Sequence, residues 1–119
     1  MNKIPAAIGP YSTNQVKDGL IITSGQLPID PEDNKINANN ITDQTNQSLK
    51  NLLNVLENEG FSKEDIMFTF VFLDDMNDFA EFNEEYSNFF GEPYPARTCI
   101  EASRLPQDAL VEIMAVAKK

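Results

Sequence analysis

Two charged residues near the C-terminus have the chemistry of a site. Glu112 lies between Leu110 and Met114 in a run that is apolar on both alternating faces, so a strand here would bury the carboxylate. Burial would raise its pKa and a nearby cation would lower it, which leaves the net direction open. Glu112 is therefore either part of a buried ion pair that fixes strand register or a subunit contact, or a functional acid–base group.

Arg97 is the second candidate. It follows Pro95 and Ala96 and shares a strand face with Cys99 and Glu101. A guanidinium is a planar fork that matches a carboxylate, and each charge-assisted hydrogen bond contributes roughly 1.5–3 kcal/mol. The alternative is a salt bridge to one of the 19 acidic residues of the chain.

Missing residue types narrow the chemistry further. The chain has no histidine, which excludes Ser-His and Cys-His nucleophile pairs and removes the usual neutral-pH general base. Cys99 is the only cysteine, so an internal disulfide and a Cys-rich metal site are excluded, and alone it is most often a small core residue. We expect no metal and no cofactor, and catalysis by carboxylates, tyrosine, arginine, backbone groups and water.

Two weaker candidates lie near the N-terminus. Tyr11 follows Gly9 and Pro10, and its side chain is either a capping aromatic or a hydroxyl aimed into a pocket. Ser24 and Gly25 end a β-prone run, where they can present a hydroxyl and a closely approached backbone to a ligand. Such strand endings are common, so neither signal is specific by itself.

The elements that position these residues follow from apolar periodicity. Residues 1–19 indicate extended chain and turns, and residues 28–40 a loop or a poor edge hairpin. The pattern predicts strands at 20–25, 66–73, 97–101 and 110–117, and helices at about 42–59 and 78–90.

The strand at 66–73 is apolar on both faces, which is typical of a central strand covered on each side. The two helices can cover one side, and the other side needs a further subunit. One α+β domain over residues 1–119 is therefore predicted, with both helices on one face of a single sheet.

Composition excludes some partners. The formal net charge is −10, so the surface should repel nucleic acid and anionic membranes, while a small anionic substrate remains possible beside a local cation. No apolar run reaches the ~20 residues that span a bilayer, and the N-terminus lacks the apolar segment of a secretory signal. We therefore expect a cytoplasmic protein.

Several motifs occur in a fixed order along the chain: Ala6 to Ser12, Ile22 to Gln26, Asp75 to Phe79 with Asn83 and Tyr86, Tyr94 to Glu101, Arg104 to Pro106, and Val111 to Ile113. In order and spacing, over essentially the whole chain, they resemble the RidA/YjgF family.

The resemblance implies a chorismate-mutase-like α+β fold with a six-stranded mixed sheet and two helices on one face. It also implies a homotrimer with a central barrel and three sites in the clefts between subunits. The implied activity is hydrolytic deamination of 2-iminobutanoate and 2-iminopropanoate to 2-keto acids and ammonia, by a 2-iminobutanoate/2-iminopropanoate deaminase that acts on C=N bonds.

By the same resemblance, Arg97 matches the arginine that binds the substrate carboxylate, and Glu112 the glutamate that orients the attacking water. Cys99 matches a position whose backbone lines the ligand, so its thiol need not react. Other positions in or beside the cleft are matched by Tyr11, Ser24, Gly25 and Asn83.

The main alternative is a non-catalytic module that binds a 2-keto acid in the same intersubunit cleft as a sensor or regulatory subunit. Both functions need Arg97 and the pocket, so only turnover separates them. RNA cleavage or translation inhibition is a third possibility, which the −10 charge and the missing histidine disfavour.

Overall fold

Seven main elements make up the structure, a computed structural model that describes residues 1–119. They are β1 (Asn14–Lys17), β2 (Leu20–Thr23), α1 (Ile41–Asn58), β3 (Ile66–Leu73), α2 (Phe79–Phe90), β4 (Ala96–Glu101) and β5 (Val111–Lys118). Short 3-10 turns cover Lys63–Asp65, Met76–Asp78 and Pro106–Asp108. The predicted α+β class and both helices are confirmed.

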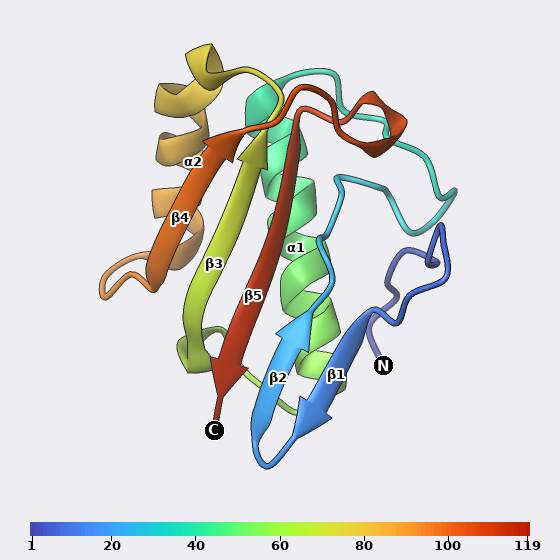
Figure 1. Ribbon diagram of the computed structural model, residues 1–119, viewed down its shortest axis with the longest axis vertical. Coiled ribbons are helices and arrows are strands. Elements are labelled where there is room, and N and C mark those ends of the chain that lie inside the picture. The colour runs from blue at the N-terminus through green and yellow to red at the C-terminus, as the bar shows by residue number, and fades with distance from the viewer.

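The strands form one mixed sheet in the order β1-β2-β5-β3-β4. Only β3 and β4 run parallel, joined by α2 as the crossover, and the other neighbours are antiparallel. Both helices lie behind the sheet in Figure 1, so the sheet shows the reader its uncovered face. The strand order matters for the site, because it places β4 at an edge of the sheet.

The side chains of β3 divide between the two faces. Thr69, Val71 and Leu73 are buried against the helices. Phe68 and Phe72 alternate with them on the other face, where they are only partly buried. One half of the sequence prediction is thus confirmed, since the helices cover one side; the remaining face is open in a single chain.

The N-terminal hairpin departs from the prediction. The sequence predicts extended chain and turns for residues 1–19, yet Asn14–Lys17 pairs with Leu20–Thr23. The two strands are joined by Asp18 and Gly19, both with positive φ (51° and 78°). This is the backbone that a tight two-residue hairpin requires, and Asp-Gly supplies it at little steric cost.

The sheet has five strands where six are expected from the family resemblance. Outside them the pairing consists only of isolated bridges, Gln26 with Ile113 and Asp30 with Lys35. Pro28 and Pro31 flank the start of the second bridge, and proline cannot donate to a ladder.

Buried amides hold the chain after β2 against α1. The fully buried Asn51 side chain donates to the carbonyl oxygens of Leu27 and Ile29, at 3.0 and 2.8 Å. Gln44 donates to Ala38 and accepts from the backbone of Leu110 at 2.8 Å. These bonds satisfy loop backbone that would otherwise be buried unpaired, and they fix the segment that carries Ser24 and Gly25.

None of the helices combines the length and the apolar character needed to cross a bilayer.

Candidate functional site

The sheet separates the two charged candidates onto opposite faces. In the β3–β4 register Arg97 is beside Thr69, which is fully buried on the helix side. In the β3–β5 register Glu112 is beside Phe72, on the open side. Residues paired across strands point the same way, so Arg97 and Glu112 cannot meet within one chain.

Arg97 is held by uncharged groups. Its Nη1 donates to Asn83 Oδ1 at 2.8 Å. The guanidinium carbon lies 4.9 Å from the ring centre of Tyr86, and 5.5 and 5.6 Å from those of Phe79 and Phe82. The two ion pairs of the chain, Lys3–Glu32 and Arg104–Asp108, lie elsewhere. The salt-bridge alternative therefore does not hold within the chain, and the positive charge stays available to a ligand.

A pocket of about 430 Å³ opens at this arginine. It is lined by Asn83, Tyr86, Ser87, Tyr94, Pro95 and Arg97. A single fixed cation among aromatic and amide groups suits a small carboxylate better than a multiply charged anion.

The backbone at Cys99 faces the free edge of β4. The Ala102 amide donates to the Leu73 carbonyl at 2.8 Å, and amides of alternate residues point to the same side of a strand. The N–H and C=O groups of Arg97 and Cys99 therefore point away from β3, toward the edge. Burial raises the pKa of the Cys99 thiol, opposed by Arg97, so the backbone is the part of Cys99 suited to a ligand.

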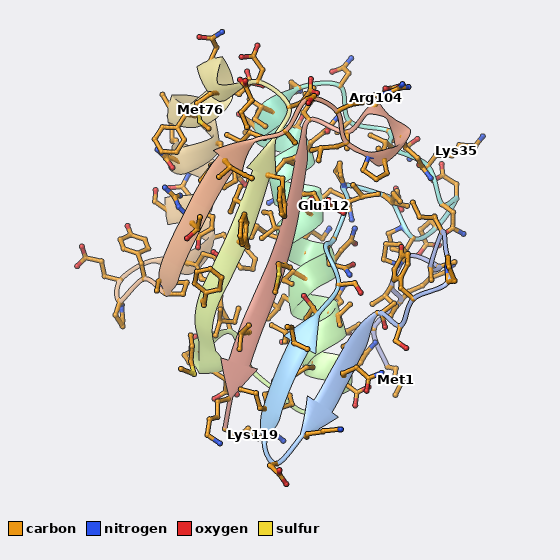
Figure 2. All side chains as sticks on the ribbon, in the orientation of Figure 1. Met1, Lys35, Met76, Arg104, Glu112 and Lys119 are labelled. Atoms are coloured by element: carbon orange, nitrogen blue, oxygen red, sulfur yellow. The ribbon has the colours of Figure 1, made fainter.

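Glu112 lines a second pocket, of about 330 Å³, on the open face. Its walls are Tyr11, Thr23, Ser24, Gly25, Phe72, Glu112 and Met114. Figure 2 shows Glu112 on the upper half of β5, beside the segment that leads away from β2. No hydrogen bond or ion pair within the chain reaches its carboxylate, and burial raises its pKa. The expected burial is thus only partial, because this face is open.

Gly25 lies directly against this carboxylate. A Cβ built on Gly25 would stand 2.6 Å from Glu112 Oε2 and 2.7 Å from Cδ, which is closer than a Cβ can approach an unbonded oxygen or carbon. The missing side chain of Gly25 therefore determines where the Glu112 carboxylate can lie.

Ser24 and Tyr11 form the rim of the same pocket. The Ser24 hydroxyl donates to the Ser12 carbonyl at 2.6 Å, and its amide donates to Thr13. The Tyr11 hydroxyl accepts from the Ile8 amide at 3.2 Å. The Ser24 hydroxyl therefore already donates its hydrogen bond within the loop, while the Tyr11 hydroxyl can still donate one to a ligand.

Comparison with known proteins shows which family the chain belongs to. The family model described as "Endoribonuclease L-PSP" matches residues 1–119. The chain belongs to the YjgF/RidA family.

Individual YjgF/RidA relatives match nearly end to end. A RutC family protein of Pyrococcus horikoshii is 47% identical over 97% of this chain and 91% of its own length. A Salmonella typhimurium protein named 2-iminobutanoate/2-iminopropanoate deaminase is 44% identical over 95% of this chain and 90% of its own. The Escherichia coli TdcF structure, with bound serine, has a TM-score of 0.94 at 40% identity and covers 98% of this chain and 94% of that one.

The structure also adds residues to the candidate site that the sequence did not single out. Tyr94 and Ser87 line the Arg97 pocket, and Phe72 and Met114 line the Glu112 pocket. Tyr94 stands next to the Pro95-Ala96-Arg97 motif and is 48% exposed. The other three need the strand register or the helix phase before they can be placed.

The contact between Gly25 and Glu112 leads to a first prediction. Gly25→Ala should push the carboxylate out of its pocket into water and thereby lower the pKa of Glu112 toward its ordinary value. A ¹³C NMR titration of the Glu112 carboxyl carbon measures this shift.

Gly91→Ala is the matched control for that titration. Gly91 has φ +64°, and a methyl group added to it would have nothing within 4 Å, so alanine there should reduce stability by about 1 kcal/mol without changing the Glu112 titration. An unchanged Glu112 pKa in Gly25→Ala would show that the carboxylate position does not depend on the glycine.

Proposed function

We propose that this protein hydrolyses reactive 2-imino acids, such as 2-iminobutanoate and 2-iminopropanoate, to 2-keto acids and ammonia in the cytoplasm. The observation that carries the proposal is Arg97, a guanidinium oriented by Asn83 at 2.8 Å and left without any carboxylate partner. A planar donor fork of this kind is suited to a carboxylate, and every substrate of this class carries one.

The reacting centre requires the second pocket as well. Because Arg97 and Glu112 lie on opposite faces of the sheet, a complete cleft takes Arg97 from one subunit and Glu112 from another. The open face of β3 and β5 carries Phe68, Phe72 and Met114, which are apolar and suit burial against a second copy. A homotrimer with three such clefts is the assembly we propose.

In the proposed reaction, Arg97 holds the substrate carboxylate and the edge backbone at Cys99 holds its neighbouring atoms. The Glu112 carboxylate takes a proton from water while the water oxygen bonds to the carbon of the protonated imine, whose nitrogen becomes an amine. Glu112 returns that proton to the amine nitrogen and the C–N bond breaks, so that ammonia leaves. The new hydroxyl group then gives its proton to Glu112 as the keto C=O forms, and Glu112 releases this proton to solvent. Imines hydrolyse even without a catalyst. A positioned acid–base group, which typically accelerates a reaction by ~10²–10⁴-fold, is therefore sufficient.

An imine-trapping competition tests turnover. An amino-acid oxidase generates 2-iminobutanoate while semicarbazide traps it, and the protein should divert the imine to 2-ketobutyrate. If wild type and Arg97→Ala both leave trapping unchanged, the enzyme proposal fails.

The alternative is a non-catalytic module that binds a 2-keto acid in the same cleft. The relative favouring it is TdcF, whose solved structure holds serine. In that case wild type would bind 2-ketobutyrate, Arg97→Ala would not, and neither would change the trapping. Binding to RNA that weakened steeply with added salt would instead support the activity in the family description.

Mixing two inactive variants tests the composite cleft. Arg97→Ala and Glu112→Gln should each be inactive alone, yet a refolded equal mixture should regain about a quarter of wild-type activity, because one cleft in four then receives an intact Arg97 and an intact Glu112 from neighbouring subunits. Activity is measured by the trapping assay after co-refolding. No recovery, with mixed trimers shown by native mass spectrometry, would mean that both residues serve the same cleft from one chain.

A further inference from the structure

A pair of hydroxyls is buried in the core behind Arg97. Thr69 Oγ1 and Tyr86 Oη are 2.7 Å apart, and the two residues are 0% and 4% exposed. Apolar residues of the same shape at both positions would pack as well, since replacing both partners of a buried hydrogen bond can be nearly neutral. The fold alone therefore gives no reason for this pair.

The pair lies beside the position on β4 from which the Arg97 side chain extends toward the helices. Thr69 is beside Arg97 in the β3–β4 register, and both side chains point to the helix side. The hydrogen bond ties Tyr86 of α2 to Thr69, and the tyrosine ring lies 4.9 Å from the guanidinium carbon. The ring is also wedged between Phe82 and Phe90, with centres at 5.4 and 4.7 Å. Its position is thus fixed at the edge by a hydrogen bond and at its sides by packing.

These contacts orient the arginine without neutralising it. The ring faces of Tyr86, Phe79 and Phe82 attract a cation but carry no net charge. Burial raises the pKa of the Tyr86 phenol, so it too stays neutral. A carboxylate in the same place would compete with the substrate for the guanidinium.

We infer that Tyr86 is a positioning residue of the carboxylate site, whose ring, fixed by Thr69, sets the orientation of the Arg97 guanidinium. The inference rests on the proposed function for its consequence in binding, and on the geometry alone for the orientation itself. Tyr86 also lines the Arg97 pocket, and its proposed role is exerted through Arg97 rather than on the reacting atoms.

Kinetics give the first test. Loss of a cation–π contact from an arginine that binds ground state and transition state alike should raise KM with kcat little changed. Tyr86→Leu should therefore raise KM for 2-iminobutanoate, and the Kd of 2-ketobutyrate, by about tenfold. Tyr86→Phe keeps the ring but loses its hydrogen bond to Thr69, so its KM should rise by about threefold, less than that of Tyr86→Leu.

Phe61→Leu is the matched control, because Phe61 is a buried aromatic that contacts a different cation, Lys119, at 4.7 Å. It should reduce stability comparably and leave KM unchanged. A fall in kcat at constant KM in Tyr86→Leu, or an equal rise of KM in Phe61→Leu, would overturn the inference.

A second readout needs neither substrate nor turnover. In wild type the Arg97 Nε–H resonance, assigned by its loss in Arg97→Ala, should show the high ¹H–¹⁵N heteronuclear NOE of an ordered side chain. In Tyr86→Leu that NOE should drop toward the value of the exposed Arg104. A mobile Arg97 in wild type would overturn the inference even if the imine is hydrolysed, whereas an ordered Arg97 without hydrolysis would leave it standing and refute the enzyme proposal.

Discussion

Arg97→Ala should reduce kcat/KM for 2-imino acids by about 10²–10⁴-fold, the equivalent of two lost charge-assisted hydrogen bonds. The fold should survive, because Arg97 makes no ion pair and its aromatic neighbours remain packed on one another. Trapping assays on the purified variant give the loss, and thermal unfolding by circular dichroism gives the stability.

The chain supplies its own control in Arg104, the second of only two arginines. Arg104 pairs with Asp108 on an exposed surface, at 3.0 Å, so Arg104→Ala should keep full activity. Arg97→Lys should fall between wild type and alanine, because lysine keeps the charge and loses the fork. If Arg97→Ala unfolds the protein, the arginine is a structural cation and the carboxylate role is wrong.

Glu112→Gln should lower kcat by ~10²–10⁴-fold while the protein still binds 2-ketobutyrate, because the amide cannot accept the proton of the attacking water. It should also make the protein more stable at neutral pH. Burial raises the pKa of Glu112, so between its unfolded and folded pKa values the folded chain holds more protons than the unfolded chain. Stability therefore falls as pH rises through that window, and glutamine removes the loss.

The pH profile of wild type supplies the matching signature. Activity should decline as pH falls through the raised pKa of Glu112, because the protonated carboxyl is no base. Glu59→Gln makes the same change of charge at an exposed position beyond α1, and should alter neither kcat nor this profile. A Glu112→Gln variant that is less stable than wild type and fully active would show that the carboxylate serves the fold.

The sequence predicts the helices and the other four strands to within a few residues, because their apolar character is strong. It does not predict β1, whose four residues, Asn14–Lys17, have no buried face to leave a pattern. The signal available for this strand is Asp18-Gly19, the pair that favours a two-residue hairpin.

The site was less accessible from the sequence. Period-two alternation along β5 shows that Glu112 and Val111 point to opposite faces of the sheet. Only the register of β3 with β4 and with β5 shows that Arg97 and Glu112 also point to opposite faces. The contact between Gly25 and Glu112 joins residues far apart in the chain, and no local pattern predicts it. The partners of Arg97 likewise depend on the phase at which α2 packs behind β4.

In the proposed homotrimer, the placement of Arg97 and Glu112 on opposite faces also has a genetic consequence. In a cell with one intact and one altered copy of the gene, an allele lacking only Arg97 would leave about half of the clefts complete, since each cleft draws one arginine from a mixed pool. An allele lacking both residues would leave about a quarter of the clefts complete, because both subunits that form a cleft must then be intact. The doubly altered allele is therefore the more dominant of the two, and alleles altered on different faces can complement each other.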